Sequence, residues 1–225
     1  MKKFLFEKIN QTLERLTFRD WLLLSAVFCL FLLTWRVVMT AEISYIFLAW
    51  NLFLAAIPYF ISGWLVKNET VPKNRFILAI AIVACLLFMP NSFYIVTDLF
   101  HLDTIASRHQ WFDLTMILTF AWTGILFGII SLRRIEIVLR PAMGKYFSPL
   151  IIFLLMWLNA FGVYIGRFLR FNSWDVISDP TSLFGDVSVI LFNPFDHKGV
   201  WAMTVCFTVF ILIIYYTVKK LAEDF

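Results

Sequence analysis

The stretch that decides the fold is "RFILAIAIVACLLFMPNSFYIVTDLFH", residues 75–101. Its apolar part, residues 76–99, can cross the roughly 30 Å hydrocarbon core of a bilayer as a helix that rises about 1.5 Å per residue. Toward the end of this helix, four polar residues recur at intervals of three, four and three: Asn91, Tyr94, Asp98 and His101. Because these intervals follow the helical period, all four should share one face. The stretch therefore predicts a transmembrane helix with a polar face at one end.

Five further stretches have the length and apolarity of membrane-spanning helices: roughly 21–38, 43–66, 112–132, 147–168 and 200–218. Of the 225 residues, 61% are hydrophobic and only 15% are charged, and the mean hydropathy is +0.84. A soluble domain of this length cannot bury so many apolar side chains in one core, so the lipid bilayer is an expected partner. The sequence predicts an all-α polytopic membrane bundle of six transmembrane helices in one domain, residues 21–218, and no nucleic-acid partner.

Positive charge is distributed unevenly between the two sides of this bundle. Most lysines and arginines fall in the N-terminal segment, the second and fourth loops, and the tail at residues 219–225. Because positively charged loops stay in the cytoplasm, we expect both termini to be cytoplasmic and the multi-pass chain to lie in the plasma membrane. Residues 1–20 combine basic residues with an apolar stripe, which predicts an amphipathic interfacial helix on the inner leaflet.

The loop before the last span should contain another interfacial helix. Asp179 suits the N-cap position and Pro180 the first helical position. Five apolar residues would then lie toward the outer interface: Leu183, Phe184, Val187, Ile190 and Leu191. Such a helix would cover whatever lies beneath it.

The polar residues within the spans are expected at one depth. Counted from the helix ends at about 1.5 Å per residue, Asn51, Asn91 and Asn159 all fall in the outer half of the bilayer. A layer of titratable residues should lie above them: Asp98, His101, Asp113, Arg167 and Arg170. Because unpaired polar groups are costly in hydrocarbon, these side chains should face inward and meet. We expect a polar funnel open to the extracytoplasmic leaflet, and an inner half with no comparable polar set.

The segment "TDLFH" supplies a candidate catalytic or metal-binding pair. Asp98 and His101 are one helical turn apart, and a carboxylate with an imidazole at that spacing can orient a general base or bind a divalent metal. Adding Asp113 or His109 would complete a site of three or four ligands. We therefore take Asp98, His101 and Asp113 as candidate catalytic residues, with Asp98 and His101 as a candidate divalent-metal site.

The run "GRFLRFNSWD", residues 166–175, is the densest polar group near the outer interface. Arg167 and Arg170, one turn apart, could hold a phosphate or carboxylate bidentately. The alternative is a basic helix end whose arginines reach the headgroups, or an ion pair with Asp98 that joins two helices and leaves His101 in solvent. The candidate ligand-binding residues are Asn51, Asn91, Tyr94, Asn159, Arg167, Arg170, Asn172 and Asp175.

Two G-x-x-x-G pairs lie in the fourth and fifth spans: Gly124 with Gly128, and Gly162 with Gly166. Small residues at that spacing let two helix backbones approach closely. The partner helix could belong to the same bundle or to a second copy of the chain. The pattern therefore also allows a homodimer that forms through either glycine pair.

Four segments together resemble a known family: "WNLFLAAIPY" (50–59), "FMPNSFYIVTDLFHL" (88–102), "WFDLTMILTFAWTGILFG" (111–128) and "GRFLRFNSWD". The family is that of bacterial integral membrane proteins grouped as domain of unknown function 1361, and the resemblance runs from about Trp50 to the last span. It implies a bacterial polytopic membrane protein. It implies no reaction, because the family has no assigned activity.

Three hypotheses for function follow. In the first, a polar pocket that opens to the extracytoplasmic leaflet binds or modifies a lipid or another amphiphile of the cell envelope. In the second, the chain is a small transporter or exporter that works as a dimer, which would require a polar path to the cytoplasmic side. In the third, it is a structural or assembly subunit whose polar residues only join helices. Whether the protein is an enzyme is left open.

Overall fold

The computed structural model describes residues 15–68, 70, 74–104 and 109–224, with the side chains of 103–104 and 142–148 left aside. Most of the expected amphipathic segment at residues 1–20 lies outside the described residues. Throughout the described part, the regular elements are helices and no strand occurs. The helical elements are α2 (Phe18–Thr40), α3 (Phe47–Lys67), α4 (Arg75–Phe88), α5 (Pro90–Tyr94), η2 (Ile95–Phe100), α6 (His101–Thr104), α7 (Gln110–Tyr164), η3 (Ile165–Leu169), α8 (Asp175–Ser178), α9 (Pro180–Phe192) and α10 (Lys198–Asp224).

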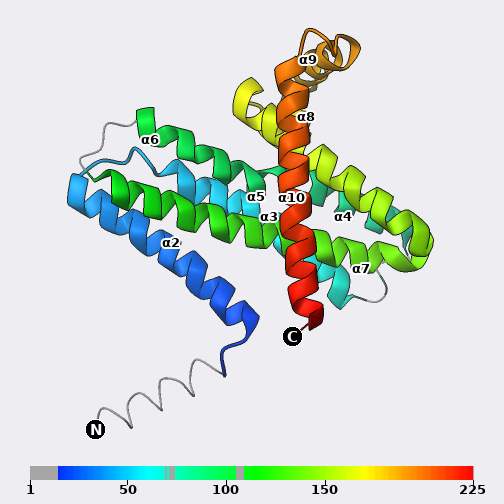
Figure 1. Cartoon of the computed structure of the whole chain (residues 1–225), viewed down its shortest axis with the longest axis horizontal. Coiled ribbons are helices and arrows are strands. Elements are labelled where there is room, and N and C mark those ends of the chain that lie inside the picture. Colours follow the sequence, from blue (N-terminus) through cyan, green and yellow to red (C-terminus); the bar gives the residue numbers. More distant parts are fainter. Residues whose placement is uncertain (1–14, 69, 71–73, 105–108, 225) are drawn as a thin grey trace.

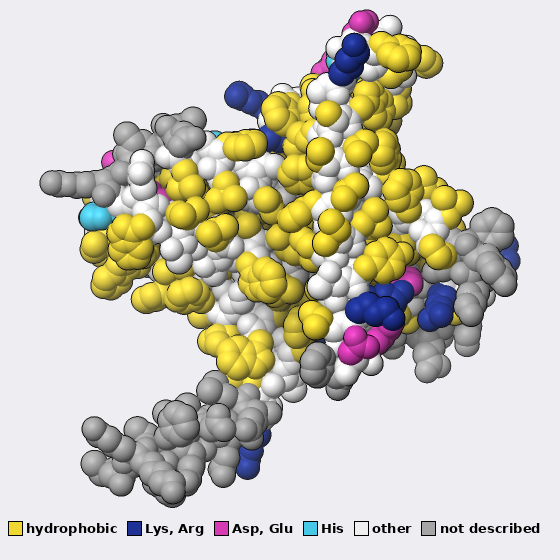
Figure 2. Space-filling view, in the orientation of Figure 1, with side chains coloured by type: hydrophobic (Ala, Val, Ile, Leu, Met, Phe, Trp, Pro, Cys, Tyr) yellow, Lys and Arg dark blue, Asp and Glu magenta, His cyan; other side chains and the backbone are white. Residues whose placement is uncertain are grey.

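Within the described ranges, six helical segments are long and apolar enough to cross a membrane. They are Phe18–Thr40, Phe47–Lys67, Arg75–Phe100, Gln110–Pro141, Pro149–Leu169 and Lys198–Asp224. The predicted all-α polytopic bundle is thereby confirmed. Large apolar side chains stay exposed along these segments, among them Leu23, Phe60 and Phe76, and hydrophobic atoms cover most of the face shown in Figure 2. A surface of this kind is suited to contact with lipid.

The long helix α7 contains two of the six spans and turns back between them (Figure 1). Both halves pack against the short helix α5. A Cβ atom on Gly124, in the first half, would lie 2.8 Å from the Ser92 carbonyl oxygen, and one on Gly162, in the second half, would lie 2.5 Å from Pro90 Cγ. The close approach predicted from the glycine pairs therefore occurs within the chain, and these faces are occupied by the chain's own α5.

Two apolar clusters flank α5 and the residues after it. The first joins α2, α3 and the first half of α7, and it includes Ile95 and Phe120. The second joins α4, both halves of α7 and α10, and it includes Phe93, Met156 and Tyr215. Phe93 and Ile95, two residues apart, are each 0% exposed and belong to different clusters. The segment after Pro90 is thus the centre of the bundle.

Helix α9 begins as its sequence predicts. The Asp179 side chain accepts a hydrogen bond from the Ser182 backbone N–H, and Pro180 occupies the first helical position. Leu183 and Ile190 are buried, while Phe184 stays exposed. One face of α9 therefore rests on the bundle, in the upper part of Figure 1.

Candidate functional site

The backbone of residues 90–104 is not one regular helix. Pro90 lacks an amide N–H, so the α-helical ladder breaks there, and the chain continues as α5, as a 3₁₀-helix over Ile95–Phe100, and as α6. A 3₁₀-helix turns about 120° per residue instead of about 100°. The four polar residues predicted to share one face are consequently divided. Asn91 and Tyr94 line a pocket, whereas Asp98 and His101 bond to Arg167, whose guanidinium carbon also lies 5.8 Å from the centre of the Tyr94 ring.

Side chains satisfy the carbonyl groups near the proline break. Asn91 Nδ2 donates to the Phe88 carbonyl oxygen (2.9 Å), and Ser173 Oγ donates to that of Leu87 (2.7 Å). Asn91 Nδ2 also donates to Ser173 Oγ (2.9 Å). These bonds tie the end of α4 to the chain after η3. They follow from the loss of regular helical bonding at a proline, which leaves carbonyl oxygens in need of donors.

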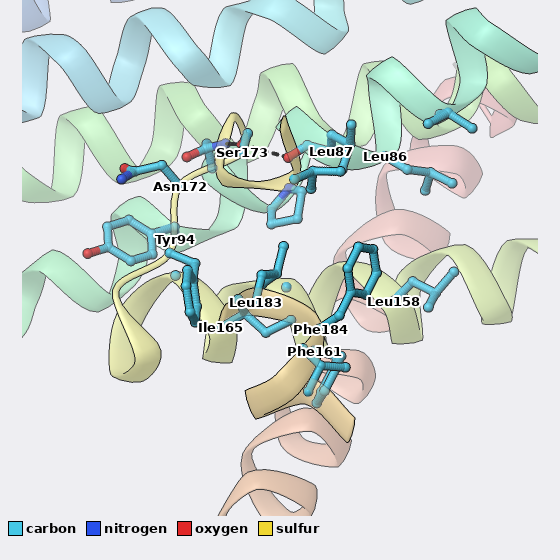
Figure 3. Close-up of a pocket in the computed structure, with 18 residues that line it drawn as sticks. Leu86, Leu87, Tyr94, Leu158, Phe161, Ile165, Asn172, Ser173, Leu183 and Phe184 are labelled. Atoms are coloured by element: carbon cyan, nitrogen blue, oxygen red, sulfur yellow. Dashed lines mark hydrogen bonds between the residues drawn. The ribbon is translucent and has the colours of Figure 1, made fainter. Parts of the chain in front are cut away.

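A pocket of about 410 Å³ lies beside this break. It is lined by α4, α5, the second half of α7, η3, residues 171–173, α8 and α9. Helix α9 contributes Leu183 and Phe184, and Leu183 lies across the pocket from Leu87 (Figure 3). Most of the lining is aliphatic or aromatic, and the hydrogen-bonding side chains are those of Asn91, Tyr94, Asn172 and Ser173.

Asp98 forms a separate, closed cluster. Its carboxylate is 1% exposed and accepts hydrogen bonds from Asn51 Nδ2 (3.0 Å) and Arg167 Nη1 (3.3 Å). Of the interpretations of this segment (an ion pair, an acid/base pair or a metal site), the ion pair is observed, with Arg167 as the partner. It joins η2 to η3, while Asn51 adds α3.

His101 is part of the same cluster, so its predicted place in solvent is wrong. Arg167 Nη1 donates to His101 Nε2 (3.2 Å), because a guanidinium has no acceptor. The imidazole also lies 5.0 Å from the Phe47 ring, centroid to centroid. Burial, together with the positive charge of Arg167, lowers the pKa of His101 below its ordinary value. A neutral imidazole at this position is consistent with the guanidinium contact.

Asp113 lies in a third cluster. It accepts a hydrogen bond from Arg36 Nε (3.2 Å), and the two side chains are 1% and 3% exposed. The Arg36 guanidinium also stacks on the Tyr45 ring at 4.8 Å. This pair ties α2 to the start of α7. Among the described residues, no group of three or more histidine, cysteine, aspartate or glutamate side chains is placed to hold a metal ion. The three-ligand site that would add Asp113 to Asp98 and His101 does not form.

The two arginines of the "GRFLRFNSWD" run do not keep their helical spacing. Arg167 belongs to η3, which is a π-helix, and Arg170 ends it in a left-handed conformation with φ 62°. Arg170 is exposed, whereas Arg167 is paired with Asp98. The Asp175 carboxylate accepts from the Asn172 backbone N–H (2.6 Å) and from Ser178 Oγ (2.8 Å), and these bonds lower the pKa of Asp175. Asp175 therefore shapes the turn before α9.

The three asparagines do not share one chamber. Asn51 bonds to Asp98, Asn91 bonds to Ser173, and Asn159 Nδ2 donates to the Leu155 carbonyl oxygen (2.7 Å) in its own helix. Asn159 is 1% exposed and its Oδ1 has no partner among the described residues. Counting residues along each helix predicted that the three asparagines lie at the same depth in the membrane. The direction in which each side chain faces depends on how the helices pack, and the count does not give it.

The expectation that one half of the bundle has no comparable polar set is wrong, because a cluster forms around Glu136. Glu136, near the end of the fourth span that lies on the side of the C-terminus, is 7% exposed and accepts hydrogen bonds from Arg133, Tyr215 and Lys219. The Lys219 Nζ contact measures 2.8 Å. One signal was available: Glu136 stands three residues after Arg133, and such pairs meet on a helix. Its two partners from α10 could not be read from local spacing.

The family assignment can now be made. The model of a protein family of unknown function, DUF1361, matches residues 50–214, from α3 to α10. The chain belongs to this family. The match confirms the resemblance carried by the four quoted segments and includes the pocket and the Asp98 cluster. No curated protein and no solved structure matches the chain.

Proposed function

We propose that the protein binds the apolar chain of an amphiphile, taken from the leaflet opposite the two termini, in the pocket beneath α9. The pocket joins an apolar interior to a few hydrogen-bonding groups, as sites for small amphiphilic molecules do. Its volume, about 410 Å³, is sufficient for part of a lipid chain. The observation that supports this proposal is the mostly apolar lining with four hydrogen-bonding side chains on it.

The position of the pocket supports entry from the side. Three of its lining residues keep about half of their surface exposed: Val83 (55%), Leu158 (53%) and Phe184 (61%). They come from α4, the second half of α7 and α9, and outward-facing residues of such helices contact lipid chains. From Val83 to Tyr94 the chain rises about 16 Å, roughly half the thickness of the hydrocarbon core. A lipid chain could therefore enter without leaving the bilayer.

The polar end of the pocket favours an uncharged group of the ligand. No charged side chain is found among the described residues that line the pocket. The donors of Asn91 and Ser173 are used in bonds within the protein, so these two offer acceptor oxygens, while Tyr94 and Asn172 also offer a donor. Arg167, expected to hold an anionic headgroup, is instead paired with Asp98. An ester, hydroxyl or sugar would match these donors and acceptors. The closed Asp98 cluster would then hold η2 and η3 in the geometry that forms the pocket.

We also propose an orientation. The end of the bundle that carries the basic second and fourth loops faces the cytoplasm of a bacterium, and the pocket opens to the extracytoplasmic leaflet.

The proposal is tested by filling the pocket. Val83→Trp places an indole at the opening, whereas Ile80→Trp places one a turn away on the same helix, at an equally exposed position (54%) outside the lining. The probe is a phospholipid with a photoactivatable acyl chain, reconstituted with each variant, and cross-linked peptides are mapped by mass spectrometry. Val83→Trp should lower labelling of α5 and α9 by about tenfold, as a loss of 1.4 kcal/mol would do. Ile80→Trp should leave it unchanged. Equal labelling in both variants would refute the proposal.

A further inference from the structure

We infer that the protein has a second lipid site, for an anionic phospholipid, in the cleft between α2 and α3 at the end of the bundle that carries both termini. The site is independent of the pocket beneath α9. It combines a basic cavity with an apolar groove that continues from it into the membrane.

The basic cavity measures about 350 Å³ and is lined by Arg19, Lys67 and Arg134 together with apolar and aromatic residues. Arg19 and Lys67 are exposed, and they come from the start of α2 and the end of α3. No carboxylate occurs among the described residues that line the cavity. Three cations without a lining anion form a site of strongly positive potential, which favours a phosphate group.

Arg134 is held in place for this role. Its Nη1 donates to the Tyr59 carbonyl oxygen (2.8 Å), and its guanidinium carbon lies 4.3 Å from the centre of the Tyr59 ring. A Cβ atom on Gly63 would lie 3.0 Å from Nη1, so the missing side chain there makes room for the guanidinium. Its chain neighbour Arg133 is paired with Glu136 instead. Across the described residues, no carboxylate lies within ion-pair distance of Arg134.

An apolar groove of about 430 Å³ adjoins the basic cavity. The two share Arg19, Tyr59 and Phe60 in their linings, and the groove continues between α2 and α3 to Leu30 and Ala49. In Figure 1, α2 diverges from α3 toward its N-terminal end, and the lining residues that α2 contributes, Arg19 to Leu30, lie in that half of the helix. A free phosphate gains no binding energy from an apolar groove, whereas the acyl chain of a lipid is stabilised there because its apolar surface is removed from water.

The length of the groove matches one leaflet. Arg19 to Leu30 on α2, and Phe60 back to Ala49 on α3, each span about 16 Å of helix axis. Half of the hydrocarbon core measures about 15 Å. A phosphate in the basic cavity would therefore place its acyl chain along the groove down to the middle of the bilayer. Trp64, which lines the basic cavity, lies at the headgroup depth where tryptophan is favoured.

The experiment measures lipid adducts of the full chain by native mass spectrometry. Three probes are titrated: long-chain phosphatidylglycerol, long-chain phosphatidylcholine, and glycerol 3-phosphate, which has the phosphate but no chain. We expect retained phosphatidylglycerol adducts, few phosphatidylcholine adducts and none with glycerol 3-phosphate. Equal retention of the two phospholipids would overturn the anionic selectivity, and binding of glycerol 3-phosphate alone would show a site for a soluble phosphate.

Charge variants separate this site from general attraction to a basic surface. The double variant Arg19→Gln with Lys67→Gln removes two exposed cations that line the cavity. The control, Arg75→Gln with Arg140→Gln, removes two exposed cations from the same end of the bundle that do not line it. The first should weaken phosphatidylglycerol binding about thirtyfold, which corresponds to about 2 kcal/mol, and the control should change it little. Equal losses in both double variants would refute the site.

A groove variant tests the place of the acyl chain without changing any charge. Ala26→Trp puts an indole into the groove, whereas Val27→Trp puts one on the neighbouring position, which is exposed and outside the lining. Ala26→Trp should abolish retained phosphatidylglycerol, and Val27→Trp should not. If Ala26→Trp binds like the unchanged protein, the apolar groove is not part of the site.

Discussion

Two buried carboxylates, one at each end of the bundle, differ in the backbone that carries them. Glu136 and its partners Tyr215 and Lys219 stand on the regular helices α7 and α10. Asp98 stands on a 3₁₀-helix and its partner Arg167 on a π-helix. Both carboxylates accept hydrogen bonds from cationic and neutral side chains. We call Asp98 with Asn51, His101 and Arg167 the outer cluster, and Glu136 with its partners the inner cluster. Only the outer cluster is built on irregular backbone.

The irregular backbone around Asp98 indicates which end of the bundle holds the functional site. Short 3₁₀ and π segments are less stable than α-helix and are frequent at functional sites. Here η3 and the break at Pro90 border the pocket beneath α9, and η2 begins directly after Tyr94, which lines that pocket. The inner cluster borders none of the described pockets and joins α7 to α10, so it is a tie between two helices. A mutation at the outer cluster should therefore disturb the pocket, and one at the inner cluster should disturb only the contact of α10.

The largest effect is expected for Asp98→Ala. It leaves the Arg167 guanidinium, 14% exposed, without its carboxylate, and loss of one partner from a buried pair costs about 3–5 kcal/mol. The measurement is the free energy of unfolding in mixed micelles. Asp196→Ala, at an exposed position in the loop before α10, serves as control and should be neutral. A loss at Asp98 no larger than that at Glu136 would remove the distinction between the two ends.

A smaller effect, about 2 kcal/mol, is expected for Glu136→Ala. Arg133 and Lys219 are 34% and 21% exposed, so both can turn toward water once the carboxylate is gone. Hydrogen exchange should increase in the C-terminal half of α10 and stay unchanged around residues 90–101. Tyr215→Phe removes only one donor and should cost about 1 kcal/mol. Faster exchange in α5 after either change would show that the two ends are coupled.

The smallest effect is a pH dependence confined to the outer cluster. Because the folded protein lowers the pKa of His101, the unfolded chain binds the proton more readily. Stability should therefore decrease as the pH falls through about 6.5, the ordinary histidine value, and level off below the folded pKa. Hydrogen exchange of η2 and α6 at pH 7.5 and pH 5.5 measures it. His101→Gln should abolish the change, and a change that persists in this variant would assign the titration to another group.

Much of the candidate site could be predicted from particular residues. The Asp98–Arg167 pair was one of three interpretations of the Asp98 segment, and the Asp179 cap and Pro180 marked the start of α9. Asn91, Tyr94 and Asn172, which line the pocket, were among the candidates, but its apolar lining was missed, because it comes from segments as far apart as Val83 and Val187. Glu136 was missed as well, since its partner Tyr215 lies 79 residues away in the sequence.

The sequence by itself determined that the chain is an all-α bundle with six helices apolar and long enough to cross a membrane. Span length and composition are local properties, and a bilayer favours helices because a helix satisfies nearly all of its own backbone groups. Only the tertiary structure decided which polar groups meet. The 3₁₀ turn after Tyr94 and the π turn before Arg170 rotate side chains away from the faces that regular helical spacing assigns. Pairs such as Arg36 with Asp113 join residues 77 positions apart, which no local pattern can specify.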